Sequence, residues 1–166
     1  MNIYFSGIGG VGIGPLAEIA YDAGYEIAGS EPTESLMTKE LCQKNVDISL
    51  NQDGSFLKSR HKNKPIDWFV YTSSLPSDHP EILMAKELGI KISKRDELIA
   101  HIIDDKNLKM IAVAGTHGKT TVTGMLVWTM KQLGIAVSYS IGTTISFGPS
   151  GKYNPCLLYT SPSPRD

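Results

Sequence analysis

The first thirty residues alternate between short apolar runs and a helical pattern of apolar positions. Ile3 and Phe5 belong to an apolar run that suits a buried strand, and a glycine-rich turn follows it. Apolar residues then recur on one face of a helix, at Leu16, Ile19, Ala20 and Ala23. Gly24 is placed to end this helix, and residues 25–29 are expected to form a second strand.

The same alternation of strand and helix patterns continues to residue 103. Helices are predicted over residues 34–44, 77–88 and 93–103, and strands over 46–50, 66–74 and 90–92. The run at 66–74 is continuously apolar, as in a strand that is buried on both faces. Ser93 and Asp96 have the spacing of a capping box at the start of the last helix. This order predicts an α/β fold, a Rossmann-like unit with a parallel, doubly wound sheet.

A polar stretch at residues 104–109 is interpreted as a link to a second unit, although a solvated loop within one domain stays an alternative. Beyond it the pattern restarts with a strand at 110–114, a loop, and a helix. One face of that helix is expected to be apolar, with Val122, Met125, Leu126, Thr129 and Leu133. We therefore expect a Rossmann-like domain over 1–105 and the truncated start of a P-loop ATP-binding central domain over 106–155.

The last residues, 156–166, read CLLYTSPSPRD and share no periodicity with what precedes them. The string matches one reading frame of the adapter DNA used in transposase-based sequencing libraries. We expect these residues to be translated adapter and not native, the alternative being a natural Ser/Pro-rich terminus.

Composition excludes some classes of function. Of the 166 residues, 41% are hydrophobic and 20% are charged, and the formal net charge is -1 without a block of basic residues. A nucleic-acid partner is therefore not expected. The sequence shows neither a signal-peptide pattern nor an apolar run long enough to cross a bilayer, so we expect a cytoplasmic protein without membrane association. The two cysteines, Cys42 and Cys156, have no metal-ligand spacing.

Gly7, Gly9 and Gly12 form a G-x-G-x-x-G pattern between a predicted strand and a predicted helix. Such glycines allow the backbone to approach a diphosphate, and the helix N-terminus adds free N–H groups. Glu31 follows the second strand, where an acid often binds a ribose hydroxyl. A purely structural glycine turn and a solvated acid are the alternatives, and the pattern does not separate NAD, FAD and UDP.

Three further residues are weaker candidates for ligand contacts. Ser73 and Ser74 close the buried strand at 66–74, and Arg95 lies at a helix start. Hydroxyls that cap a loop and a solvated charge are the respective alternatives.

A second loop, Gly115-Thr116-His117-Gly118-Lys119-Thr120-Thr121, has the end of a P-loop pattern. Gly118 allows the turn, Lys119 can reach the β- and γ-phosphates, and Thr120 can ligate Mg²⁺. The glycine that a full P-loop has five residues before Gly118 is replaced by Val113. The residues predict ATP binding.

Together these segments resemble the Mur ligases, the ATP-dependent amide-forming enzymes of peptidoglycan assembly. The resemblance covers nearly all of residues 1–155 and rests on GIGGVGIGPLAEIA, GYEIAGSE, YTSSLPSDHPEI, SKRDELIAHII and, most specifically, IAVAGTHGKTT. His117 is similar to the loop of the alanine-adding and tripeptide-adding members. The resemblance implies that the UDP-sugar site is formed by Gly7, Gly9, Gly10, Gly12, Glu31, Ser73, Ser74 and Arg95. It implies that Gly115 to Thr121 bind ATP, that Lys119 is catalytic and that the Thr120 hydroxyl ligates Mg²⁺.

The resemblance also implies a reaction. The lactyl carboxylate of UDP-N-acetylmuramate would attack ATP to give an acyl phosphate, which L-alanine would displace. Because the family's later acid and its C-terminal domain have no counterpart here, this chain alone is expected to be inactive. A tripeptide-adding ligase, a non-catalytic UDP-sugar-binding module and a nicotinamide-dependent oxidoreductase stay as alternatives.

Overall fold

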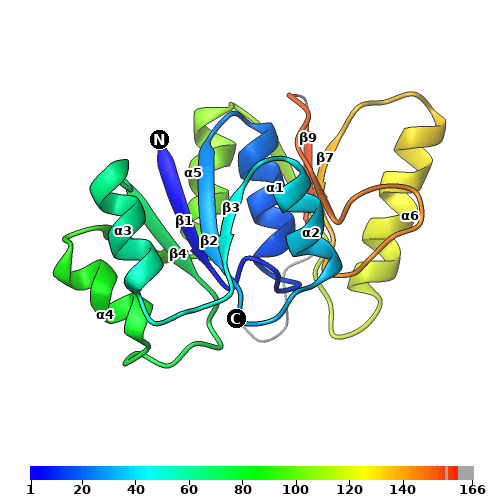
Figure 1. Cartoon of the computed structure of the whole chain (residues 1–166). Helices are drawn as coiled ribbons and strands as arrows, with labels where there is room; N and C mark the ends of the chain where they lie inside the picture. The colour runs from blue at the N-terminus through cyan, green and yellow to red at the C-terminus, as the bar shows by residue number, and fades with distance from the viewer. Residues whose placement is uncertain (156, 161–166) are drawn as a thin grey trace.

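The computed structural model describes residues 1–155 and 157–160, which form two α/β units side by side (Figure 1). The first unit is built on a five-stranded sheet with the order β3-β2-β1-β4-β5, and every pair of neighbours is parallel. Its strands are β1 (Asn2–Ser6), β2 (Glu26–Ser30), β3 (Asp47–Ser49), β4 (Trp68–Tyr71) and β5 (Lys91–Lys94). Its helices are α1 (Gly14–Asp22), α2 (Leu36–Gln43), α3 (Ser55–Asn63), α4 (Pro80–Glu87) and α5 (Arg95–Asp105). The predicted doubly wound α/β fold is confirmed.

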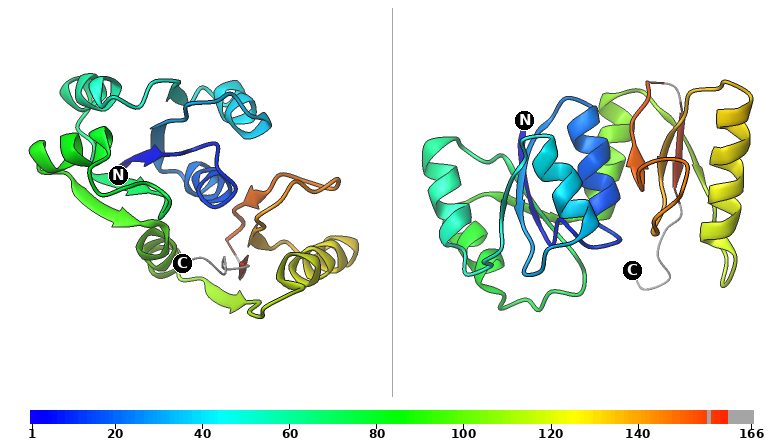
Figure 2. Two further views of the ribbon diagram at one scale, coloured as in Figure 1. Left: turned by 90° about the horizontal axis from the view of Figure 1, so that it is seen from below. Right: turned by 45° about the vertical axis from the view of Figure 1, so that its right-hand side comes forward.

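Helices cover both faces of this sheet (Figures 1 and 2). Side chains alternate along β1, so that Ile3 and Phe5 pack on one face with α1, α2 and α5, while Tyr4 packs on the other with α3 and α4. All three are fully buried. Burial on both faces explains why the central strands read as continuous apolar runs and not as alternating ones.

Local sequence accounts for some helix ends and not for others. Ser35 caps α2, because its hydroxyl accepts from the Thr38 amide at 3.2 Å and Thr38 Oγ1 accepts from the Ser35 amide at 2.8 Å. The capping box predicted at Ser93 is wrong. The N-cap of α5 is Lys94, and the Ser93 hydroxyl instead accepts from Trp68 Nε1 at 2.7 Å.

The helix α3 was not expected from the sequence. Only Leu57 of its nine residues is buried, so the apolar periodicity of this segment is weak. Its start is fixed by a loop contact, in which Asp53 Oδ1 accepts from the Ser55 amide at 2.8 Å. Hydrogen bonds from the Ser55 side chain and then from its amide hold the pKa of Asp53 below its usual range.

The second unit holds a four-stranded sheet with the order β6-β9-β7-β8, in which β8 is antiparallel to β7. Its elements are β6 (Lys109–Ala112), α6 (Lys119–Gln132), β7 (Ser138–Ser140), β8 (Gly151–Lys152) and β9 (Leu157–Thr160). The strand β9 lies within the segment interpreted as adapter, whose other residues, 156 and 161–166, lie outside the described residues. The domain boundary at 105 and the origin of the tail stay predictions.

The expected apolar face of α6 is only partly buried. Met125 and Leu133 are 64% and 66% exposed, and the fully buried positions are Thr123 and Val127. Val122 is exposed as well, so three positions of this face do not pack inward. The helix buries Val127 against Val137, Tyr139 and Ile141.

The two units meet where β8 packs against α1. The buried Glu18 accepts a hydrogen bond from the Gly151 amide at 2.7 Å, and a Cβ on Gly151 would lie 2.0 Å from the Pro15 carbonyl oxygen. The approach of the two backbones therefore requires glycine. Among the helices that the structure describes, none has both the length and the apolar character needed to cross a membrane.

Candidate functional site

The strand register brings four chain segments to one edge of the first sheet. Ser6 at the end of β1 is paired with Ser30 of β2 and with Tyr71 of β4, and Tyr71 is paired with Lys94 of β5. The strands β2 and β3 extend the sheet on one side of β1, and β4 and β5 extend it on the other. The edge between β1 and β4 is therefore a topological switch point, where open α/β sheets bind ligands.

The glycine-rich loop lies directly at this switch point. The Gly7 and Ile8 amides donate to the Ser30 carbonyl at 2.9 and 3.0 Å. The Gly9 amide donates to Glu31 Oε2 at 2.8 Å, so the loop is held from β2. Burial raises the pKa of Glu31, and the hydrogen bond from Gly9 opposes this rise. Glu31 thus orders the loop, a role that the sequence did not predict.

The rest of the loop leads into α1. The Gly10 amide donates to the Gly7 carbonyl at 3.0 Å, and the Gly14 amide donates to the Gly10 carbonyl at 2.7 Å. A Cβ on Gly12 would lie 3.3 Å from an Arg95 guanidinium nitrogen. The structure therefore brings the N-terminus of α5 against the loop, as the placement of Arg95 in the predicted site requires.

The two candidate serines follow β4 at the same edge. Ser73 and Ser74 are exposed, and the Ser74 and Thr72 hydroxyl oxygens are 3.0 Å apart. A Cβ on Gly7 would lie 3.2 Å from Thr72 Cγ2, so this segment borders the glycine-rich loop. All eight residues predicted for a UDP-sugar site therefore lie in segments that leave the sheet at one edge.

A buried carboxylate lies beneath this edge and was not predicted. Glu81 in the first turn of α4 is fully buried. It accepts hydrogen bonds from the Tyr4 hydroxyl at 2.7 Å, from Ser6 at 2.5 Å and from Ser30 at 2.7 Å. Burial, and then the charge of Glu81, raises the pKa of Tyr4 above its usual range. The only sequence signal for this cluster was that the apolar strands β1 and β2 each end in a serine.

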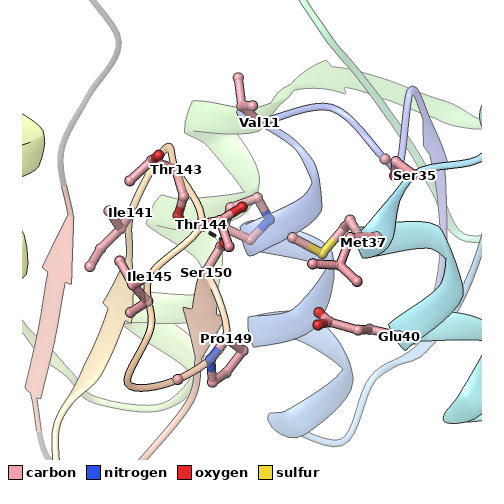
Figure 3. A pocket seen from close by; sticks show the side chains of 14 residues that line it. Val11, Ser35, Met37, Glu40, Ile141, Thr143, Thr144, Ile145, Pro149 and Ser150 are labelled. Atoms are coloured by element: carbon pink, nitrogen blue, oxygen red, sulfur yellow. Dashed lines mark hydrogen bonds between the residues drawn. The ribbon is translucent and has the colours of Figure 1, made fainter.

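A cleft of about 320 Å³ opens between the first unit and the second (Figure 3). One wall carries Val11 of the glycine-rich loop and Met37 of α2, and the other is the segment 141–150 before β8. Met37 and Thr144 project into the cleft from opposite walls, and Glu40 lies at one end of it (Figure 3). Sequence reasoning missed this wall, because residues 141–150 have no motif of their own.

The second candidate loop leads directly into the N-terminus of α6. Gly118 caps α6 with φ +80°, in the left-handed region that favours glycine, and α6 begins at Lys119. The Lys119 ammonium donates to the Gly115 carbonyl at 2.7 Å. Thr116, His117, Gly118, Thr120 and Thr121 are exposed. This loop lies at the same end of the molecule as the glycine-rich loop, the lower end in Figure 1.

The groups that this loop offers are backbone N–H donors and one lysine. The first-turn amides of α6 have no intrahelical acceptor, and Lys119 adds a cation beside them. No group of three His, Cys, Asp or Glu side chains that could hold a metal occurs among the described residues. Thr120 is exposed at the start of α6, where its hydroxyl is the metal ligand that the sequence predicts.

The fold and the switch-point loop define the class of this protein, a doubly wound α/β unit with a glycine-rich loop at its switch point. The model named "Mur ligase family, catalytic domain" matches residues 2–107, and the chain belongs to the Mur ligase family.

Curated relatives carry a more specific name. The UDP-N-acetylmuramate–L-alanine ligase of Clostridium novyi (strain NT) is 38% identical over 124 residues, which are 75% of this chain and 26% of that protein. The ligase of the same name from Campylobacter jejuni (strain RM1221) is 41% identical over 125 residues, or 75% of this chain and 27% of that protein. The chain therefore spans about a quarter of the length of these relatives.

Solved structures show the same fold. A UDP-N-acetylmuramate–alanine ligase from Thermotoga maritima matches with a TM-score of 0.83, over 96% of this chain and 36% of that chain. A UDP-N-acetylmuramate:L-alanyl-γ-D-glutamyl-meso-diaminopimelate ligase from Neisseria meningitides matches with a TM-score of 0.81, over 96% and 52%. Both are 24% identical to this chain, and this likeness is evidence of the fold alone.

Proposed function

We propose that the chain is the N-terminal part of an ATP-dependent ligase that joins L-alanine to the lactyl carboxylate of UDP-N-acetylmuramate in peptidoglycan synthesis. The observation that carries this proposal is the convergence of the glycine-rich loop, Glu31, Ser73, Ser74 and Arg95 at one switch point. The names of the curated relatives favour L-alanine over a tripeptide as the second substrate. The reaction is proposed to be cytoplasmic.

In the proposed site, the first unit binds the UDP-sugar. The loop from Gly7 to Gly12 presents backbone without side chains, and the N-terminus of α1 adds a partial positive charge for the diphosphate. Arg95, beside Gly12, supplies a full positive charge. Glu31 keeps the loop in place through Gly9 and accepts from a ribose hydroxyl. The Ser73 and Ser74 hydroxyls are further donors at this edge.

The second unit is proposed to contribute the residues that bind ATP. Gly115 to Thr121 and the first-turn amides of α6 hold the phosphates, Lys119 neutralises their charge, and the Thr120 hydroxyl ligates Mg²⁺. When bound, ATP supplies the phosphoryl group that activates the lactyl carboxylate as an acyl phosphate. Such chemistry rests on positioning and charge neutralisation. The 166 residues alone are proposed to be inactive, because they span about a quarter of the relatives' length.

Isothermal titration of the chain with UDP-N-acetylmuramate, UDP and NADH tests the proposal for the first unit. We expect the UDP compounds to bind and NADH not to bind. Arg95→Ala is expected to weaken UDP binding by at least tenfold, since a hydrogen bond to a charged group contributes about 1.5–3 kcal/mol. The matched control is Arg60→Ala. Arg60 of α3 forms an ion pair with Asp47 and is not among the residues predicted for the site. Binding of NADH without binding of UDP would refute the proposal.

The ATP loop is tested separately, with an ATP analogue that cannot be hydrolysed. Lys119→Ala is expected to reduce its affinity at least tenfold, whereas Lys58→Ala on the exposed surface of α3 is expected to leave it unchanged. Equal affinities of the two variants would contradict the assignment of this loop.

A further inference from the structure

We propose that Glu81 is a positioning residue of the UDP-sugar site, which sets the backbone of the glycine-rich loop from beneath the sheet edge. The inference rests on the proposed function of that site. Glu81 does not reach the ligand, and it acts through the ends of β1 and β2.

The hydrogen-bond donors of Glu81 lie on two neighbouring strands, β1 and β2. Ser6 and Ser30 are the last residues of β1 and β2 and are paired in the sheet, and both donate to Oε2 of Glu81. Tyr4, two residues earlier in β1, donates to Oε1. All three donors are fully buried. One carboxylate from α4 therefore joins the two central strands at the point where they leave the sheet.

Only a few hydrogen bonds separate this cluster from the glycine-rich loop. The Ser30 carbonyl accepts the amides of Gly7 and Ile8, the first two residues of the loop. Ser30 also precedes Glu31, which accepts the amide of Gly9. Three consecutive amides of the loop are thus held by two residues, one of which is bonded directly to Glu81. A shift of Ser30 would move all three.

This geometry requires a side chain with two hydrogen-bonding atoms at its end. Two oxygens accept three hydroxyl protons, and the Ser30 hydroxyl in turn accepts from Gln52 Nε2 at 3.1 Å. Glutamine retains one oxygen for both serines and can donate its amide to the Tyr4 hydroxyl oxygen. Alanine leaves three buried hydroxyls without an acceptor.

The test compares three variants at a temperature where circular dichroism shows each to be folded. Glu81→Ala is expected to raise the dissociation constant for UDP-N-acetylmuramate at least tenfold, and Glu81→Gln to keep it within about threefold of the parent. The matched control is Leu57→Ala, which opens a cavity on the same face of the sheet but removes no hydrogen bond to Glu81. It is expected to lower stability and to leave the affinity unchanged.

Amide hydrogen exchange separates this inference from the proposed function. In Glu81→Ala, exchange at Gly7, Ile8 and Gly9 is expected to be at least tenfold faster, without a matching change in Leu57→Ala. If the parent does not bind the UDP-sugar, the proposed function fails, and exchange still tests the positioning role. Ser30→Ala provides a milder variant should Glu81→Ala not fold, with faster exchange expected at the same amides. Unchanged exchange in the folded variants would overturn the inference.

Discussion

Glu18 joins the two units, and its buried side chain has a raised pKa. It lies on α1, is 1% exposed, and accepts from the Gly151 amide of β8 at 2.7 Å. Burial raises its pKa from the ordinary value of 4.5 to about 7, although the Gly151 hydrogen bond and the charge of Lys44 oppose the rise. The buried contact between the units therefore titrates near neutral pH.

The magnitude follows from linkage between protonation and folding. One pKa unit corresponds to about 1.4 kcal/mol, so the difference between 4.5 and about 7 corresponds to about 3 kcal/mol. Between these pH values the folded state holds a proton that the unfolded state has released. The free energy of unfolding therefore falls as pH rises from about 4.5 to about 7, and the effect of Glu18 is constant above and below this window.

Glu18→Gln isolates this effect. Glutamine keeps an acceptor oxygen for the Gly151 amide and does not ionise, so the variant should lose the pH-dependent penalty. We expect the stability of Glu18→Gln relative to the parent to rise by about 2–3 kcal/mol between pH 4.5 and pH 8. Urea unfolding measured by tryptophan fluorescence reports it, because Trp68 is buried in the core of the first unit.

Glu87→Gln is the matched control, because Glu87 is exposed near the end of α4. Its stability difference from the parent should not vary over the same pH range. Parallel pH profiles of Glu18→Gln and the parent would refute the argument that burial at the contact between units controls the ionisation of Glu18.

Two further substitutions test the packing. Gly151→Ala places a Cβ 2.0 Å from the Pro15 carbonyl oxygen, so we expect a loss of about 1–3 kcal/mol in thermal unfolding, whereas Gly124→Ala on open helix surface should stabilise α6. An unchanged unfolding midpoint in Gly151→Ala would show that β8 does not pack this closely against α1. Trp68→Phe removes the 2.7 Å hydrogen bond to Ser93, and we expect it to lower the unfolding free energy by about 1–3 kcal/mol in urea titrations. A double-mutant cycle with Ser93→Ala checks the pairing, and additive losses in the two single variants would contradict it.

The sequence by itself determined the architecture of the first unit. Its strands β1 and β4 are apolar runs because both faces are covered, and its first helix shows its buried face in Leu16, Ile19 and Ala20. The glycine-rich turn between them fixes where the ligand-binding edge lies, because the first βα turn of such a fold adjoins the switch point. Family membership followed from the same local patterns. Local patterns suffice where neighbours in the chain are also neighbours in space.

Only the tertiary structure decided the contacts between segments that are distant in the sequence. Glu81 reads as one more acid at a helix start, and it becomes a buried acceptor because Tyr4, Ser6 and Ser30 converge on it from two strands. Ser93 has capping spacing, yet its hydroxyl is bonded to the Trp68 indole from the neighbouring strand. A side-chain oxygen accepts from whichever donor the fold brings within about 3 Å, and sequence spacing does not reveal donors that lie tens of residues away.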